Sequence, residues 1–150
     1  DVEYVRASAS LPLLSRIVEL DGKKLLDGGV CDSIPIRKFQ SMGYARNIVV
    51  LTQYGGYRKQ KSASLPLIRA RYHAYPRFVE KMEDRHLRYN DTLDLLNEEE
   101  KKGNVLIIRP KKPVKISRLE KNVEKLQALY DEGYADTAGM IQDIRAFLAG

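Results

Sequence analysis

The sequence predicts an α/β fold, with a narrow, mostly parallel sheet, a hairpin and flanking helices. Two runs of consecutive apolar residues, 48–51 and 105–108, are bounded by polar residues. Such runs are typical of strands that are covered on both faces. The apolar spacing between these runs is helical, and strands that alternate with helices favour a parallel sheet.

The first third of the chain predicts short elements. A helix over residues 2–10 ends before Leu11-Pro12. Two strands, 17–20 and 24–26, flank Asp21-Gly22, a strong hairpin-turn dipeptide. Pro35 opens a helix that reaches Met42. The two core strands are expected at 47–52 and 105–108, in one sheet with the hairpin.

Three helices are predicted in the rest of the chain. The first begins near Phe78, ends by Gly103 and carries an apolar stripe of Val79, Met82, His86, Tyr89, Leu93 and Leu96. The second opens with a capping box at Ser117 and Glu120 and ends at Gly133. It is expected to bury Leu119, Val123, Leu126 and Tyr130. The third, over 135–148, presents Ala138, Ile141, Ile144 and Leu148.

The length and composition predict one domain with its own core. The chain has 150 residues, of which 43% are hydrophobic and 31% charged. Its apolar runs are far shorter than the roughly 18 residues that a membrane span needs. Cys31 is the single cysteine, which excludes an internal disulfide. We expect a cytoplasmic or peripheral membrane protein.

Positive charge is concentrated in residues 33–79, which contain nine Lys and Arg and no carboxylate. Such a block attracts anionic partners. The alternatives are that another segment supplies the missing acids, or that the cations are simply solvated. Six of these cations interleave with Tyr54, Tyr57, Tyr72 and Tyr75, a composition suited to a membrane interface. The expected contacts with anionic lipid are Arg58, Lys59, Lys61, Arg69 and Arg71.

Several kinds of site have no support in the sequence. The only histidines, His73 and His86, lie 13 residues apart and make no metal-binding pattern. There is no phosphate-binding P-loop and no dinucleotide fingerprint, so we expect neither a metal nor a cofactor. The G-x-S-x-G motif of a nucleophilic serine is also missing from these 150 residues.

The segment around Asp27-Gly28-Gly29 carries the most specific signal. Alone it reads as a turn, which two adjacent glycines release from the usual φ/ψ limits. In the string LDGKKLLDGGVCDSIPI at 20–36, it directly follows a strand and precedes a proline. This string resembles the patatin-like phospholipase family, in which a short strand delivers D-G-G or D-G-A. The small residues of 7–12 and the strands at 47–52 and 105–110 are also similar to bacterial members. Ser33 stands where that family often has Asn.

The resemblance implies an acyl hydrolase with a Ser–Asp dyad and a lipid or ester substrate. In that family a serine attacks the ester carbonyl, and the aspartate of D-G-G/A takes its proton directly. The corresponding residue is Asp27, with Gly28 and Gly29 supporting the loop and letting another segment approach. A carboxylate is ionised at neutral pH and can accept that proton.

The family carries its serine and its oxyanion loop before the D-G-G strand, and nothing here matches either. The chain also begins at Asp1 rather than at a methionine. We therefore expect residues 1–150 to be the C-terminal half of a patatin-like domain, with part of the three-layer fold that the resemblance implies. Its partner would be the N-terminal half of the same protein, and alone it would be inactive. The sequence leaves the oligomeric state open.

Two other functions remain open. One is an α/β-hydrolase fragment in which Asp27 works with His73 or His86. The other is a non-catalytic basic module that binds anionic lipid or nucleic acid through residues 37–77. Because no nucleic-acid motif accompanies these cations, nucleic acid is not expected as a partner.

Overall fold

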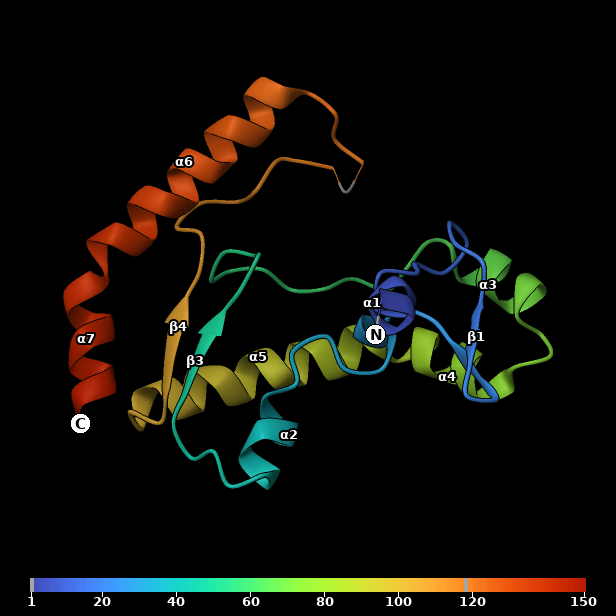
Figure 1. Cartoon of the computed structure of the whole chain (residues 1–150), viewed down its shortest axis with the longest axis horizontal. Coiled ribbons are helices and arrows are strands. Elements are labelled where there is room, and N and C mark those ends of the chain that lie inside the picture. Colours follow the sequence, from blue (N-terminus) through green and yellow to red (C-terminus); the bar gives the residue numbers. More distant parts are fainter. Residues whose placement is uncertain (1, 118) are drawn as a thin grey trace. The chain divides into compact units, whose positions relative to one another are not determined.

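The structure is a computed structural model that describes residues 2–117 and 119–150 (Figure 1). Helices and strands are mixed along the chain, which confirms the general α/β class. In chain order they are α1 (Val2–Ser8), β1 (Val18–Leu20), β2 (Lys23–Leu25), the 3-10 turn η1 (Gly28–Val30), α2 (Ile36–Ser41), β3 (Asn47–Val50), α3 (Leu65–Arg71), α4 (Pro76–Glu83), α5 (Arg85–Lys101), β4 (Val105–Ile108), α6 (Val123–Gly139) and α7 (Ile141–Ala149).

The described residues pack into two compact units. The first contains the chain up to Pro35 together with Arg58–Leu93, and the second contains Ile36–Tyr57 and Asp94–Gly150. The expected single sheet is wrong, because the described strands form two separate two-stranded sheets. The hairpin residues Ile17 and Leu26 pack on the core of the first unit instead of extending a sheet with β3.

The hairpin in the first unit is confirmed. Strands β1 and β2 pair antiparallel, with Leu20 opposite Lys23. The turn residues Asp21 and Gly22 have φ of 49° and 69°. Two successive positive φ angles match the right-handed twist of a hairpin, and glycine adopts them without a steric penalty.

The core of the first unit is built mainly by α3 and α4. Its buried residues are Val30, Leu65, Ile68, Tyr72 and Met82. Helix α3 was not expected, since Pro66 reads as a break in the sequence. In the structure this proline stands in the first turn of α3, where its missing N–H has no intrahelical partner to lose.

The long helix predicted from Phe78 onward is interrupted. Helix α4 ends at Glu83, and α5 begins at Arg85 after the C-cap residue Asp84. Of the predicted stripe, Met82, Leu93 and Leu96 are buried, whereas Val79, His86 and Tyr89 are only partly buried.

The sheet of the second unit is the predicted parallel pair. Asn47 lies opposite Val105 and Val50 opposite Ile108. The expectation that both faces are covered is wrong for β3, because Ile48 and Val50 are 37% and 71% exposed. A cavity of about 110 Å³ lies between these strands and α6, and Val50, Ile108 and Leu129 help to line it.

The capping box predicted at Ser117 and Glu120 does not begin α6. The N-cap is Asn122, whose side chain accepts a hydrogen bond from the Lys125 N–H at 3.0 Å. The Glu120 carboxylate instead accepts from the N–H groups of Lys121 and Asn122. Gly133 also fails to end the helix, which runs on to Gly139.

The prediction of which side chains of α6 are buried is also wrong. Leu119, Val123, Leu126 and Tyr130 are exposed, by between 43% and 76%, although their spacing predicts burial. Of the residues expected on α7, Ile141 and Leu148 are exposed as well. The side of α6 that carries Leu129 and Asp136 instead faces the segment after β4. There Asp136 forms an ion pair with Lys111 at 2.9 Å.

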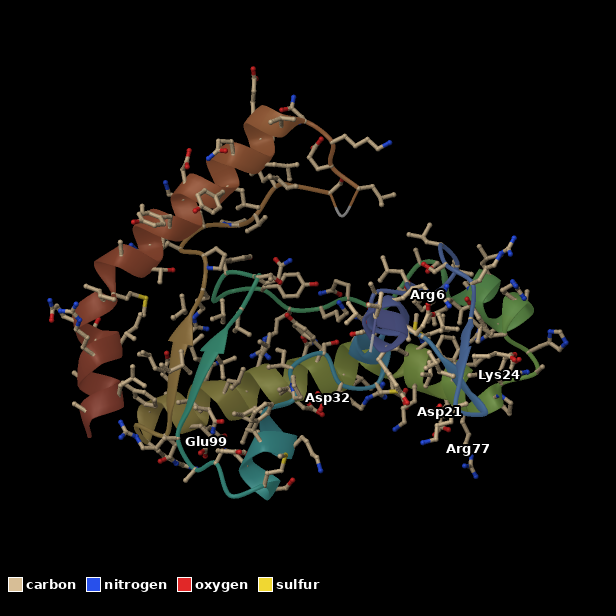
Figure 2. The ribbon with its side chains drawn as sticks, in the orientation of Figure 1. Arg6, Asp21, Lys24, Asp32, Arg77 and Glu99 are labelled. Atoms are coloured by element: carbon tan, nitrogen blue, oxygen red, sulfur yellow. The ribbon has the colours of Figure 1, made fainter. Side chains whose placement is uncertain are left out.

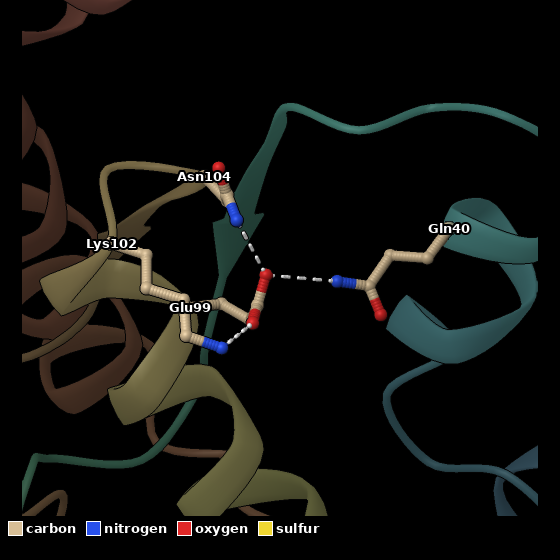
Figure 3. A network of polar contacts seen from close by, with 4 residues as sticks. All are labelled: Gln40, Glu99, Lys102 and Asn104. Carbon is tan, nitrogen blue, oxygen red and sulfur yellow. Dashed lines mark hydrogen bonds and ion pairs between the residues drawn. The ribbon is translucent and has the colours of Figure 1, made fainter.

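A buried carboxylate joins three parts of the second unit. Glu99, 8% exposed, lies near the end of α5 (Figure 3). Its carboxylate accepts hydrogen bonds from Lys102 at 2.8 Å and Asn104 at 2.9 Å. Gln40 of α2 donates a third at 3.3 Å. The hydrogen bonds from Lys102 and then Asn104 lower the pKa of Glu99 below its ordinary value of 4.5.

This network predicts an acid-labile second unit. A lowered pKa means that ionised Glu99 stabilises the fold above about pH 4.5, and that this contribution is lost as the pH falls further. In Glu99→Gln, we expect the urea midpoint at pH 7 to be lower than in the wild type. We also expect it to fall less between pH 6 and pH 3. Glu98→Gln, at the exposed neighbouring position, should keep the wild-type pH profile, and identical profiles for all three proteins would contradict the role of Glu99.

Candidate active-site loop

Asp27 stands at the start of η1, directly after the hairpin. It is the N-cap residue, and its Oδ1 accepts a hydrogen bond from the Gly29 N–H at 2.7 Å. Aspartate favours this position because its short side chain reaches the amide two residues on. The side chain is partly exposed, and Oδ2 accepts no hydrogen bond from the described residues. One carboxylate oxygen is thus fixed, and the other remains available.

The backbone around Asp27 is anchored at both ends. The Asp27 N–H donates to the carbonyl of Ser10, just after α1, at 2.8 Å. The Val30 N–H donates to the Asp27 carbonyl at 3.1 Å, and the Val30 side chain is 3% exposed within the core of the first unit. The small residue Ala7, also buried, lets the end of α1 come this close. The loop is therefore part of the packed structure of the first unit.

The two glycines act differently from the sequence expectation. Neither Gly28 nor Gly29 has a positive φ in the structure. A Cβ at Gly29 would lie 3.1 Å from Oδ1 of Asp27, so the carboxylate would have to shift by a few tenths of an ångström to make room for it. At Gly28 a Cβ would meet nothing within 4 Å, so that side of the loop is open to an approaching group.

Two residues fix the carbonyl of Gly29. Ser33 donates its hydroxyl to this oxygen at 2.6 Å, and Arg85 of α5 donates its Nε–H at 2.8 Å. Ser33 therefore holds the loop where the resembling family often has Asn. Sequence reasoning missed Arg85 and its neighbour Arg88. Their signal was two arginines three residues apart beside the apolar stripe of a helix.

The histidines do not join Asp27 in the described part of the chain. Nδ1 of His73 lies 3.0 Å from the Ala70 carbonyl, and Nδ1 of His86 lies 3.0 Å from that of Glu83. Each imidazole thus contacts a carbonyl three residues before it in the chain, which disfavours a catalytic pair of Asp27 with either imidazole. No three His, Cys, Asp or Glu side chains gather as a metal site among the described residues.

The five cations expected at a lipid surface all lie in the first unit, and most are already engaged there. Arg58 donates to the Asn90 carbonyl at 3.2 Å. Nζ of Lys59 lies 4.9 Å from the centre of the Tyr89 ring. Arg69 forms an ion pair with Glu83 at 2.6 Å, so a carboxylate from outside the basic block neutralises it.

The other two cations, Lys61 and Arg71, are exposed. The guanidinium of Arg71 lies 5.7 Å from the centre of the neighbouring Tyr72 ring, and neither side chain pairs with a described carboxylate. Within the part of the chain that the structure covers, no helix combines the length and apolar character needed to cross a bilayer.

Comparison with known families divides the chain. Residues 75–149, half of its length, match the model of a domain of unknown function, DUF6363. Residues 2–39, which include Asp27, match the patatin-like phospholipase model. This match is narrower than the resemblance in the sequence, which extends to the strands at 47–52 and 105–110. No curated protein matches the chain.

Proposed function

We propose that this chain supplies the aspartate of an acyl hydrolase with a Ser–Asp dyad. The chain belongs to the DUF6363 family, and its residues 2–39 match the patatin-like phospholipase model. Asp27 is the general base, and the substrate is a lipid or another ester. The observation that carries this proposal is the state of the Asp27 carboxylate. Oδ1 is held by the Gly29 N–H at 2.7 Å, while Oδ2 accepts no hydrogen bond from the described residues.

The chemistry assigned to Asp27 is proton transfer. A serine hydroxyl donates to Oδ2, and as its oxygen attacks the ester carbonyl the proton moves to the carboxylate. The proton then passes to the leaving alkoxide, so the carboxylate is regenerated. The hydrogen bond from Gly29 holds the side chain in one rotamer, and the open side of Gly28 gives the serine room to approach.

The serine and the oxyanion donors are assigned to a segment outside these 150 residues, because no G-x-S-x-G occurs among them. In the experiments below, "the longer enzyme" means a polypeptide that contains both that segment and the present 150 residues. Hydrolysis of p-nitrophenyl butyrate by the longer enzyme and its Asp27→Asn variant tests the proposal. Undiminished turnover by the variant would refute it.

The same proposal assigns a lipid contact to the basic block. Lys61 and Arg71 are exposed and pair with no described carboxylate, so their charge remains available to anionic headgroups. We expect the chain to float with vesicles that contain phosphatidylglycerol and to remain unbound with pure phosphatidylcholine. Each cation contributes about 1 kcal/mol at such a surface. Reversal of both charges, in Lys61→Glu with Arg71→Glu, should therefore weaken binding about tenfold or more.

The control for this experiment is Lys81→Glu, an exposed lysine of α4 outside the basic block. This single substitution changes the net charge by half as much as the double substitution does, but it should leave flotation nearly unchanged. Equal binding to neutral and anionic vesicles would remove the lipid contact from the proposal. A loss that depends only on net charge, and not on position, would do the same.

A further inference from the structure

The first turn of α5 reaches the loop that carries Asp27. The Nε–H of Arg85 donates to the Gly29 carbonyl at 2.8 Å, and its Nη2 lies 3.4 Å from the Ser33 hydroxyl. One turn later, Nη2 of Arg88 donates to the Val30 carbonyl at 3.3 Å and to the Lys81 carbonyl at 2.6 Å. Two arginines of one helix thus bind consecutive carbonyls of η1.

The geometry at Gly29 links these arginines to the carboxylate. Its N–H donates to Oδ1 of Asp27, and its carbonyl accepts from Arg85 and Ser33. A Cβ on Gly29 would lie 3.1 Å from Oδ1 of Asp27 and 3.7 Å from Nη2 of Arg85. The carboxylate and the guanidinium therefore lie on the same side of this one residue. Any shift of the Gly29 carbonyl would also move the amide that orients Asp27.

The burial of Arg88 strengthens this picture. Its Nε is buried and has no acceptor in the described part of the chain. A buried donor without a partner is costly, so the bonds that Nη2 makes must offset that cost. One of them goes to the carbonyl of Val30, whose side chain is anchored in the core.

We infer that Arg85, supported by Arg88, is a positioning residue for the dyad aspartate, an inference that rests on the proposed function of Asp27. The two arginines lie in the segment that matches DUF6363, and the loop lies in the patatin-like segment. Within the first unit, the DUF6363 segment therefore holds the general base in place. A general base misplaced by about 1 Å can lose a hundredfold in rate, so such support is needed.

The contacts of residue 85 require an arginine rather than a lysine. The planar guanidinium of arginine presents five donors in a fixed fork, so Nε and Nη2 can reach two acceptors of the loop at once. A lysine keeps the positive charge but has a single, freely rotating ammonium group. Arg85→Lys therefore separates the geometric role from the effect of charge alone.

The first test measures the loop in the 150-residue chain, without any reaction. The amides of Val30, Cys31 and Asp32 donate to carbonyls inside the loop, at 3.0–3.1 Å. Hydrogen exchange of these amides, followed by NMR, should accelerate about tenfold or more in Arg85→Ala, since hydrogen bonds to a charged group are the strong ones. Arg85→Lys should give a smaller acceleration, and amides of the hairpin should exchange as in the wild type.

The matched control is Arg77→Ala. Arg77 is an exposed arginine of α4, labelled in Figure 2, and should leave exchange of the loop unchanged. If Arg85→Ala fails to fold, Arg85→Lys and Ser33→Ala still test the same carbonyl contact. Unchanged exchange of the loop in the folded Arg85 variants would overturn the inference.

The second test uses the longer enzyme and p-nitrophenyl butyrate. We expect Arg85→Lys to lower kcat about tenfold or more while KM stays near the wild-type value, because the base is misplaced and the ester pocket is untouched. In an Asp27→Asn background, the same change should cause little further loss. A purely structural role would lower the amount of folded enzyme and leave kcat per folded molecule unchanged, and that result would refute positioning.

The two proposals fail in different ways. If Asp27→Asn keeps full activity, the proposed function is wrong, even when Arg85 variants loosen the loop. If Asp27→Asn is inactive and Arg85→Lys keeps its kcat, the function stands and the positioning role is wrong.

Discussion

Asp27→Asn should lower the kcat of the longer enzyme by about 10²–10⁴-fold, the usual contribution of a general base. The amide of asparagine is neutral and cannot take the proton of the serine hydroxyl. Its oxygen can still accept the hydrogen bond that the Gly29 N–H donates to Asp27, and asparagine caps a helix as well as aspartate does. The loop should therefore keep its shape, and the loss should lie in the chemical step.

The matched control for this prediction is Asp32→Asn. Asp32 lies five residues further on, and its exposed side chain is labelled in Figure 2. The same loss of charge at this position should leave kcat within about twofold of the wild type, since surface substitutions usually have small effects. The 150-residue chain by itself should release p-nitrophenol only at the background rate. Robust turnover by this chain, or equal losses in both variants, would contradict the role of Asp27.

Ile68→Ala should destabilise the first unit by about 2–5 kcal/mol, the range for truncation of a large buried aliphatic side chain. Ile68 is 1% exposed and packs in the cluster with Val30, Leu65, Tyr72 and Met82. The substitution leaves a cavity that rigid neighbours fill only in part. Because Val30 belongs to η1, the loss should also loosen the loop that carries Asp27. Urea unfolding followed by far-UV circular dichroism should place the midpoint about 1 M lower or more.

Leu67 offers a control at the adjacent position of the same helix. It is 59% exposed, so Leu67→Ala should change the free energy of unfolding by no more than about 0.5 kcal/mol. Alanine also favours a helix as strongly as leucine does, which leaves little propensity effect. Equal destabilisation by the two substitutions would mean that burial of Ile68 does not hold this unit together.

Local rules explain which elements were predictable. The Asp21-Gly22 turn, helix α1 and the strands β3 and β4 follow from a few neighbouring residues each. The parallel pairing of β3 with β4 also followed, because a helix-bearing connection between strands favours that direction. Helix α3 was missed because Pro66 is compatible with both a break and a first helical turn.

Which face of a helix or strand is buried, and which residues it contacts, was harder to predict than the helix or strand itself. The period of α6 gives a stripe through Val123, Leu126 and Tyr130, but this stripe faces solvent. The ion pair of Asp136 with Lys111 joins residues 25 positions apart, and no pattern within the helix encodes it. The sheet was overestimated for the same reason, since the hairpin packs on a core made largely by α3 and α4.

The candidate site shows the same difference between local contacts and contacts across the core. The sequence by itself determined the turn at Asp27, because the hydrogen bond from the Gly29 N–H spans only two residues and needs no other part of the chain. Only the tertiary structure decided what holds that turn. Arg85 is 56 residues from Gly29, and the two meet because residues 85–93 of α5 belong to the same compact unit as η1. Local hydrogen bonds are determined by adjacent residues, whereas contacts across a core depend on how every intervening element packs.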